Sequence, residues 1–376
     1  MDFKLNEKIQ IMDSYIKYIE SIFEHEGIKT GLLDEEHLAH AKALRHELKL
    51  RKKCPEEFIE KFDSPINVQF ELTSQCNQHC LMCYNQSGSG SANDDLNINQ
   101  WIKIAEDLAS VNVPQVIISG GEPTLLGDDL FKIMDIFHEI GSQFILITNG
   151  MLINEDNIHK FVKYDYVWMQ FSIDGATEST HDYIRGAKGA FNKVVHAVAL
   201  ARAHGIPVGI ASTIQKKNLN ELSDLIDLAY YLGAFKHHLG EFMYTGRAII
   251  NKSKIELTGE DIIYIGKTLK KKRVEYAQEI SIAKPFDPAL NLRTHMCQPA
   301  TGIVIRPNGE VRIDCQAPGR IGNVKEKNIL DIWKDAGYKS WSHPKLLEYI
   351  SKVMNYKDLN EVYPRTHYDP DLDLSF

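Results

Sequence analysis

Six short apolar runs alternate with amphipathic helical patterns through the middle of this 376-residue chain. We expect the runs to be strands, and they cover residues 66–72, 115–118, 144–148, 167–173, 208–214 and 237–242. The helical patterns between them include residues 100–110, 130–140, 191–204 and 219–232. Because each helix returns the chain to the same edge of the sheet, this alternation predicts an α/β fold with a parallel sheet and right-handed crossovers.

Three of the six cysteines in the chain lie within eight residues, directly after the first of these runs. Their spacing is Cys76-x-x-x-Cys80-x-x-Cys83, and a loop that leaves a strand end can bring three thiolates to one centre. A structural zinc site takes four ligands, whereas an iron–sulfur cubane held by three cysteines keeps one iron open for a substrate or cosubstrate. The motif therefore favours an iron–sulfur cluster, with zinc or three unrelated cysteines as the alternative.

The composition limits the compartment and the partners. The formal net charge of −8 argues against general affinity for nucleic acids or anionic membranes, since both need a basic surface. No apolar run is long enough to cross a bilayer, and the first residues lack the pattern of a signal peptide. Six cysteines are too few for a disulfide framework, and thiolate-held iron also requires a reducing compartment. We therefore expect a cytoplasmic protein.

Between residues 65 and 333 the chain resembles the radical S-adenosylmethionine (radical SAM) enzymes, in which the same cysteine spacing holds the cluster. Three further motifs follow in the order of that family: Ser-Gly-Gly-Glu-Pro at 119–123, Thr-Asn-Gly at 148–150, and Ser-Ile-Asp-Gly at 172–175 followed by His-Asp-Tyr-Ile-Arg-Gly at 181–186. The motifs follow the expected strands, at the edge where parallel sheets bind their ligands. The resemblance implies a partial (β/α)6 barrel over residues 65–245.

The resemblance also implies the cofactors and the reaction. Cys76, Cys80 and Cys83 would hold one 4Fe–4S cluster, whose open iron binds S-adenosylmethionine (SAM). An electron from a donor such as flavodoxin or ferredoxin cleaves SAM, and the resulting 5'-deoxyadenosyl radical abstracts a hydrogen atom from the substrate. The residues implied as SAM contacts are Met82, Tyr84, Gly120, Gly121, Glu122, Asn149, Ser172, Asp174 and Arg185.

The first of these contacts belong to the cysteine loop and to the glycine motif. Gly120 and Gly121 let the backbone approach the amino group of SAM, and Glu122 can accept a hydrogen bond from that ammonium. Met82 stands where the family usually has an aromatic residue. A thioether can also pack on the adenine, and Tyr84 is the nearest aromatic substitute.

The other contacts follow the third and fourth strands. Asn149 comes directly after the third strand. Ser172 and Asp174 offer acceptors for the ribose hydroxyls or the amine of SAM, and Arg185 offers a fork for its carboxylate. The alternative for Asp174 is a plain turn, and the alternative for Arg185 is a surface ion pair.

The segments on either side of the barrel are expected to be largely helical. Residues 1–64 carry apolar side chains at three- and four-residue steps, and a second helical segment covers 34–53. This N-terminal extension is either a packing element or a recognition module for a partner. The strands of the winged-helix domain that peptide-binding family members often carry are absent from its pattern. Residues 246–290 are expected to be a linker followed by a helix that starts at Gly259.

The C-terminal region, residues 291–376, begins with two apolar runs joined at Pro-Asn-Gly, which predicts a β-hairpin between Cys297 and Cys315. It resembles the start of a SPASM domain or of its shorter twitch form, which hold auxiliary iron–sulfur clusters, but no cysteine follows Cys315. The two cysteines are either ligands of an auxiliary cluster or catalytic hydrogen-atom donors in a degenerate domain. The other ligands of such a cluster would come from Cys54, His295 or Asp314.

Two classes of function fit these features. The first is a radical SAM enzyme that crosslinks or epimerises a ribosomally synthesised peptide, because residues 246–248, the hairpin and the segment 322–333 look most like such maturases. The alternative within this class is a small-molecule dehydrogenase, epimerase or rearrangement enzyme of secondary metabolism. The second class is a non-catalytic zinc-binding or ligand-binding protein. A protein of that class is expected to have lost a cysteine or glycine of the motifs, and this chain retains them all.

Overall fold

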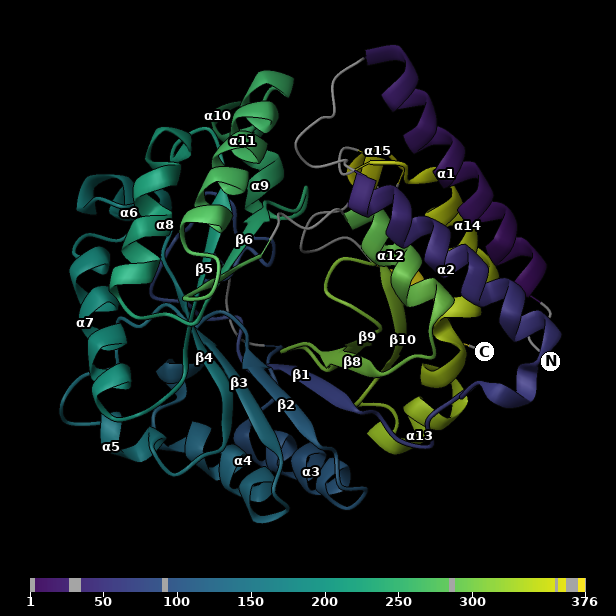
Figure 1. The fold of residues 1–376 in the computed structure, drawn as a ribbon. Coiled ribbons are helices and arrows are strands. Elements are labelled where there is room, and N and C mark those ends of the chain that lie inside the picture. The colour runs from purple at the N-terminus through teal and green to yellow at the C-terminus, as the bar shows by residue number, and fades with distance from the viewer. Residues whose placement is uncertain are drawn as a thin grey trace.

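In a computed structural model, the structure describes residues 4–26, 35–89, 94–283, 288–355, 358–362 and 371–375. One sheet of eleven strands runs through the molecule, and helices lie along its outside (Figure 1). The strand order is β11-β10-β9-β8-β1-β2-β3-β4-β5-β6-β7. The barrel strands and the C-terminal strands therefore belong to one continuous sheet.

Strands β1 to β7 are parallel neighbours and form the barrel half. Their bounds are β1 (Asn67–Glu71), β2 (Gln115–Ser119), β3 (Gln143–Thr148), β4 (Tyr166–Ser172), β5 (Val208–Ile214), β6 (Lys236–Glu241) and β7 (Ser281–Ile282). The first six match the expected strands to within one residue at each end, so the prediction of a parallel, partial (β/α)6 barrel is confirmed.

The helical elements of this half follow the strands in turn. Their bounds are α3 (Ile98–Ala109), η2 (Pro123–Leu126), α4 (Asp128–Glu139), α5 (Ile158–Phe161), α6 (Glu178–Arg185), α7 (Ala190–Ala203), η3 (Leu219–Glu221), α8 (Leu222–Tyr231), α9 (Arg247–Ile250), α10 (Lys252–Ile255) and α11 (Gly259–Glu275). The expected helix that starts at Gly259 is therefore present as α11.

Aromatic packing fixes the end of β1, from which the cysteine loop leaves. The ring of Phe70 lies 5.6 Å from the rings of Trp101 on α3 and Phe137 on α4. All three side chains are fully buried, and the indole Nε1 of Trp101 donates to the carbonyl of Leu72 at 3.0 Å. The strand end is thus held by both apolar contact and a hydrogen bond, which gives the loop a defined origin.

The C-terminal half extends the sheet beyond the barrel. Its elements are α12 (Pro288–Cys297), β8 (Gly302–Ile305), β9 (Glu310–Arg312), β10 (Gly319–Asn323), α13 (Ile329–Asp335), η4 (Gly337–Ser342), α14 (Pro344–Lys352), α15 (Asp358–Val362) and β11 (Leu372–Asp373). Strands β8 and β9 form the predicted hairpin, and Gly309 has the positive φ of +87° in its turn. Strand β8 also pairs with β1 in parallel, so the hairpin stands directly beside the strand that carries the cysteine loop.

The N-terminal extension consists of α1 (Leu5–Glu26) and α2 (Glu35–Lys53), followed by η1 (Pro55–Glu57). Both helices pack on α12, and α1 also packs on α14, so the extension covers the C-terminal half rather than the barrel (Figure 1). Met12, Tyr15 and Ile19 of its apolar stripe are fully buried, and the guanidinium of Arg293 lies 4.0 Å from the centre of the Tyr15 ring. The helical prediction is confirmed, but the surface that these helices cover could not be read from the stripe.

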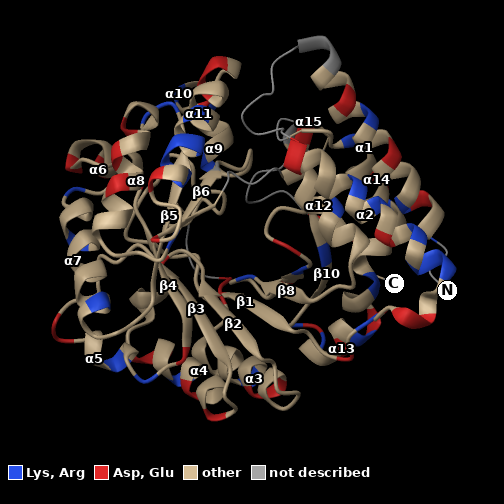
Figure 2. Ribbon diagram, viewed as in Figure 1, with Lys and Arg blue, Asp and Glu red and all other residues tan. Residues whose placement is uncertain are grey.

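Charged residues lie mainly on the helices, and the barrel strands carry few of them (Figure 2). Among the described residues, no helix combines the length and the apolar character needed to cross a membrane. The predicted divisions after residues 64, 245 and 290 stay a prediction, and the sheet continues across the last two because β7 and β8 belong to it.

Candidate active site

A cavity of about 730 Å³ opens at the carboxyl ends of the barrel strands. The C-terminal half closes its other side with Asn291 and His295 of α12 and with Asp314 and Gln316, which follow β9. The predicted site residues that line it are Cys76, Cys80, Met82, Cys83, Tyr84, Gly120, Gly121, Glu122, Asn149, Ser172, Arg185 and Cys315. Asp174 and Cys297 do not line this cavity.

The backbone of the cysteine loop is hydrogen-bonded to the end of α6, and side-chain nitrogens lie near two of its sulfurs. The backbone N–H groups of His79 and Leu81 donate to the carbonyls of Arg185 and Ile184, each at 2.9 Å. The Nη1 atom of Arg185 lies 3.7 Å from the sulfur of Cys80. These contacts fix the loop without closing the cavity to a ligand.

The three sulfurs have the chemistry that an iron–sulfur cluster needs. Burial raises the pKa of Cys76 to about 12 and also raises the pKa of Cys80, so their thiolates need compensating positive charge, which iron supplies. No group of three or more His, Cys, Asp or Glu in the described residues lies close enough together to hold a single metal ion. The arrangement therefore disfavours the zinc alternative, because the ligands of a cluster surround several irons and stand further apart.

The two motif glycines make room for the cysteine loop. A Cβ atom on Gly121 would lie 2.0 Å from the carbonyl oxygen of Gln75, and one on Gly120 would lie 2.9 Å from that of Thr73. The N–H of Gly121 donates to the Thr73 carbonyl at 2.6 Å, and the N–H of Glu122 donates to the Gln75 carbonyl at 2.9 Å. The close approach seen here is between two loops of the protein, and because both glycines also line the cavity, their approach to the amino group of SAM stays a prediction.

Glu122 holds the end of β3 in place. Its Oε1 accepts from the N–H and hydroxyl of Thr124 at 3.1 and 2.6 Å and from the Thr148 hydroxyl at 2.7 Å, while its Oε2 accepts from the N–H of Asn149 at 2.7 Å. The side chain is 1% exposed, and burial raises its pKa. Three of these donors bind Oε1 and one binds Oε2, so Oε2 keeps acceptor capacity, and the contact with the ammonium of SAM stays a prediction.

Asp174 positions Arg185. It is fully buried, its Oδ1 accepts from the N–H of Thr213 at 2.6 Å, and its Oδ2 pairs with Nη2 of Arg185 at 2.5 Å. Asp174 does not line the cavity, although both of its partners do, and its contact with the ribose or amine of SAM stays a prediction. Arg185 does line the cavity. One of its guanidinium nitrogens pairs with the buried Asp174 and another faces the sulfur of Cys80. Arg185 is therefore not part of a surface ion pair, and its guanidinium is not wholly free to bind the carboxylate of SAM.

Asn149 and Ser172 lie at the ends of β3 and β4 and face the cavity. The amide Nδ2 of Asn149 donates to the side chain of Asn77 at 2.7 Å and lies 4.0 Å from the sulfur of Cys76. Asn149 therefore braces the loop next to the first cysteine. The hydroxyl of Ser172 makes no hydrogen bond to another described residue, which leaves it available for a ligand.

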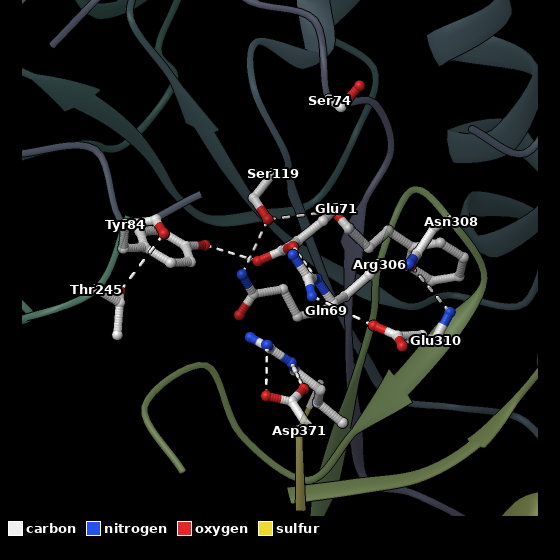
Figure 3. Close-up of polar contacts among 12 residues, drawn as sticks. Gln69, Glu71, Ser74, Tyr84, Ser119, Thr245, Arg306, Asn308, Glu310 and Asp371 are labelled. Carbon is white, nitrogen blue, oxygen red and sulfur yellow. Dashed lines mark hydrogen bonds and ion pairs between the residues drawn. The ribbon is translucent and has the colours of Figure 1, made fainter. Parts of the chain in front are cut away.

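Tyr84 joins the cysteine loop to a buried network that sequence reasoning missed (Figure 3). Its hydroxyl donates to Oε1 of Glu71 on β1 at 2.7 Å, and Nε of Arg306 lies 3.8 Å from the other oxygen of Glu71. Arg306 follows β8 and also pairs with Glu310 of β9 at 3.3 Å. Burial, followed by the charge of Glu71, raises the pKa of Tyr84. The network connects the cysteine loop, the barrel and the hairpin. It could have been predicted only from the pairing of β1 with β8, which the sequence does not show.

Met82 takes part in an apolar cluster behind the second cysteine. It is 8% exposed and packs with Phe242 and Tyr244, which follow β6. Because Met82 also borders the cavity, the predicted thioether contact with adenine stays a prediction.

Arg247 is a second residue that sequence reasoning did not assign to the site. Its Nε donates to the carbonyl of Cys80 at 2.8 Å, and its Nη1 donates to the carbonyl of Ser87 at 2.8 Å and to the hydroxyl of Ser89 at 2.6 Å. The preceding Gly246 lies so close to the loop that a Cβ atom would be 2.3 Å from the carbonyl oxygen of Tyr84. The segment after β6 therefore holds the cysteine loop in place through hydrogen bonds and close backbone packing.

Cys297 and Cys315 face different cavities. Cys315 borders the active-site cavity, whereas Cys297 is 3% exposed and borders a second cavity beside α1 and α2. Burial raises the pKa of Cys297 to about 12, so this thiol stays protonated. Whether the two cysteines hold an auxiliary cluster with Cys54, His295 or Asp314 stays a prediction. Cys297 does not line the active-site cavity, and its role as a hydrogen-atom donor also stays a prediction.

Two family models match the chain. The model of the radical SAM superfamily matches residues 70–229, and the SPASM model, an iron–sulfur cluster-binding domain, matches residues 297–356. The second match confirms the predicted resemblance of the C-terminal region to a SPASM-type domain. No cysteine follows Cys315, so an auxiliary cluster would need ligands besides Cys297 and Cys315.

Several characterised proteins are similar to most of this chain. An AdoMet-dependent heme synthase of Methanosarcina barkeri is 27% identical, over 78% of this chain and 90% of the relative. The sporulation killing factor maturation protein SkfB of Bacillus subtilis is also 27% identical, over 72% of this chain and 65% of the relative. The fold is similar to that of Streptococcus suis SuiB, solved with its precursor peptide SuiA, with a TM-score of 0.59, 17% identity and coverage of 80% of this chain and 70% of SuiB. Together with the cysteine loop at the strand ends, these matches show that residues 70–229 form a radical SAM domain and that residues 297–356 form a SPASM-type region.

Proposed function

We propose that this enzyme modifies a ribosomally synthesised peptide by crosslinking or epimerisation. The cluster and SAM supply a 5'-deoxyadenosyl radical that abstracts a hydrogen atom from the substrate. The residues of this chain hold the cysteine loop, shape the cavity and exclude water from it. The maturation protein SkfB among the relatives supports a peptide substrate.

The observation that carries this proposal is the chemistry of the cavity wall. Neutral carboxamides line it from several directions, and a carboxamide can donate to and accept from a peptide bond at the same time. They are Gln69, Gln78, Asn85, Asn149, Gln170, Asn291 and Gln316. The side-chain amide of Gln170, in the middle of β4, makes no hydrogen bond to another described residue. A peptide backbone fits such a wall better than a strongly charged metabolite.

The same wall argues against a tetrapyrrole, the type of product named for the heme synthase relative. A tetrapyrrole presents several carboxylates, which call for Arg or Lys partners. Among the described residues, Arg185 and Arg247 are the only Arg or Lys side chains that line the cavity, and most of their donors already bind the cysteine loop or its neighbours. A small molecule without several carboxylates is the second candidate for the substrate. The C-terminal half forms one wall of the cavity, so the cavity can enclose a small molecule.

An epimerase needs a hydrogen-atom donor inside the cavity, and we propose Cys315, which lines it, for this role. Its S–H would give a hydrogen atom to the Cα radical, and one electron and one proton from the external donor would restore the thiol. Replacing Cys315 by Ala should stop epimer formation and leave SAM cleavage intact. Cys297→Ala tests the other predicted donor, and because Cys297 lies outside the cavity, we expect this variant to keep epimer formation. Epimer formation by Cys315→Ala would rule out this role.

The proposal is tested by coexpression of the enzyme with a library of ribosomally made peptides. A crosslink removes two hydrogen atoms from a peptide, whereas epimerisation in deuterated water leaves one deuterium at Cα, so mass spectrometry separates the outcomes. The variant with Cys76, Cys80 and Cys83 all replaced by Ala is the control. Turnover of a small molecule such as a coproporphyrin, with no peptide altered, would refute the proposal. An electron donor such as flavodoxin or ferredoxin, and a reducing compartment such as the cytoplasm, belong to the same proposal.

A further inference from the structure

Strands β4, β5 and β6 form one side of the active-site cavity, and their part of its wall carries no charge. The three strands are neighbours in the sheet (Figure 1). The Asp, Glu and Arg residues that line the cavity are Glu122, Arg185, Arg247 and Asp314, and all of them come from outside these strands. The lining residues that share the inner face of the three strands are Gln170, Ser172, Ala211, Thr213, His238 and Gly240. We call these six residues the uncharged wall.

His238 of this wall has a ring without a partner, whereas the ring of its neighbour His237 has one. Successive residues of a strand face opposite sides of the sheet. The ring of His237 is fully buried on the outer side, and its Nε2 lies 2.8 Å from the hydroxyl of Ser212. The ring of His238 faces the cavity and makes no hydrogen bond to another described residue. Both ring nitrogens of His238 are therefore available to a ligand.

Small residues leave open space beside His238. Ala211 stands between Ser172 and His238 in the strand register, and because adjacent strands are about 4.8 Å apart, about 10 Å separates the two outer Cα atoms. Gly240 follows His238 on the same face, and a Cβ atom there would meet nothing within 4 Å. Glycine inside a strand weakens the strand and often marks the close approach of a ligand. The space over Ala211 and Gly240 is therefore room for a group that contacts His238.

Trp168 and Lys236 bound this space toward the starts of the strands. A Cβ atom at Gly209 would lie 3.0 Å from Cδ1 of Trp168, so the indole covers Gly209. Nζ of Lys236 lies 4.6 Å from the centre of the Trp168 ring. Burial, followed by the charge of Lys236, lowers the pKa of His238, so its imidazole is neutral at pH 7. A neutral imidazole offers one donor and one acceptor.

The wall favours an uncharged group that both donates and accepts. Amides and hydroxyls do both, and they match a neutral imidazole and the unpaired amide of Gln170. A carboxylate only accepts, and its burial without a cation costs more than that of an amide. An aliphatic group would leave His238 and Gln170 without partners. His238 also stands three residues before the end of β6, about 10 Å inside the strand end, a depth that a side chain reaches more readily than a backbone that crosses the strand ends.

We propose that His238 selects the substrate by binding an amide or hydroxyl side chain of the peptide in the space over Ala211 and Gly240. This inference rests on the proposed peptide-modifying function and names the kind of side chain that the cavity accepts. Ser172, on the other side of Ala211, is a predicted SAM contact, so the bound side chain would lie beside that predicted contact. His238 is then a specificity-determining residue.

The test uses the anaerobically reconstituted holoenzyme with SAM and three capped peptides, acetyl-Ala-X-Ala-amide, in which X is Asn, Asp or Leu. The three X side chains are similar in size, and saturation-transfer NMR measures weak binding without turnover. The parent should bind the Asn peptide about tenfold more tightly than the other two, because only the amide satisfies the imidazole. His238→Phe keeps a ring but loses both nitrogens, so it should bind the Leu peptide at least as tightly as the Asn peptide. A purely structural role of His238 would not change the order of the peptides.

Two further variants separate ligand binding from folding. His237→Gln, on the opposite face of the same strand, should lower the thermal stability and keep the preference for the Asn peptide. Gly240→Val fills the space beside His238 and should weaken the binding of all three peptides about tenfold. Iron content, and SAM binding measured by equilibrium dialysis, should match the parent in His238→Phe and Gly240→Val.

An unchanged preference for the Asn peptide in His238→Phe overturns the proposal, and so does a loss of SAM binding in this variant, which would assign His238 to SAM. Equal binding of the three peptides by the parent, or tighter binding of the Asp peptide, also overturns it. A ribosomal peptide that His238→Phe modifies with the KM of the parent would refute the role of His238 and leave the proposed function standing. A parent enzyme that prefers the Asn peptide but modifies no ribosomal peptide would instead refute the proposed function.

Discussion

Replacing Arg247 by Met should release the cysteine loop and lower the iron content of the protein. The side chain is 9% exposed and donates to the buried carbonyls of Cys80 and Ser87, each at 2.8 Å. Hydrogen bonds from a charged group contribute about 1.5–3 kcal/mol each, so the loop loses about 3–6 kcal/mol of support. Because the loop carries all three cluster cysteines, we expect this loss to appear first in cluster binding.

Arg293 provides the matched control. It is fully buried, and its guanidinium also donates to backbone carbonyls, those of Ala289, Ile350 and Val353 at 2.9, 3.0 and 2.7 Å. It stabilises the C-terminal half and lines neither cavity. Arg293→Met should therefore lower the melting temperature at least as much as Arg247→Met, yet retain the iron of the folded protein.

The assay is iron and sulfide analysis after anaerobic reconstitution, together with visible absorption and thermal unfolding of each variant. The parent should bind about four irons, Arg247→Met clearly fewer, and Arg293→Met as many as the parent. Arg247→Lys keeps the charge but loses the fork that reaches several acceptors, so we expect an intermediate iron content. Full iron in Arg247→Met, with a loss of thermal stability equal to that of Arg293→Met, would refute the role of Arg247 as a brace of the loop.

Three other predictions follow from the geometry. Gly121→Ala should prevent cluster assembly, because its Cβ would lie 2.0 Å from the Gln75 carbonyl, whereas Gly259→Ala, with open space around it, should bind iron normally. Burial lowers the pKa of His181 and His237 to about 3. As the pH falls, these histidines are therefore protonated in the unfolded chain before they are protonated in the folded protein. Stability should then drop below pH 6.5, by about 2 kcal/mol per histidine at pH 5, and a flat urea-unfolding profile between pH 7 and 5 would contradict this. Arg306→Met should destabilise the fold by about 3–5 kcal/mol in the same assay, because it leaves the buried Glu71 without its cation, and Glu71→Gln in that background should restore part of the loss.

The strands and the order of the motifs were predictable because they depend on local pattern. An apolar run of five to seven residues between helical segments allows few alternatives, and β5 was predicted at its observed bounds, Val208–Ile214. The contacts between segments were not predictable in the same way. The pairing of β8 with β1, which brings Arg306 to Glu71, joins residues far apart in the sequence, and no periodicity records it. The separation of Cys297 from Cys315 likewise depends on the directions that the chain takes before β8 and after β9, and these directions are not encoded in a local pattern.

Three of the predicted site residues also have a structural role. Glu122, Asp174 and Gly121 have the residue types expected of ligand contacts, and they engage neighbouring segments of the protein. A cluster held by one short loop needs that loop fixed from several sides, and buried polar groups without partners are costly, so the motif residues satisfy each other.

Contact with SAM and the substrate then depends on the polar groups that remain without partners. Two buried donors at the cavity, Nε of Arg185 and Nη2 of Arg247, have no hydrogen-bond partner, and the Ser172 hydroxyl bonds to no other described residue. The two guanidinium groups belong to side chains that already brace the cysteine loop. A ligand that accepts from them would therefore be bound by the same residues that hold the cluster, so cluster assembly and ligand binding should be lost together when either arginine is replaced.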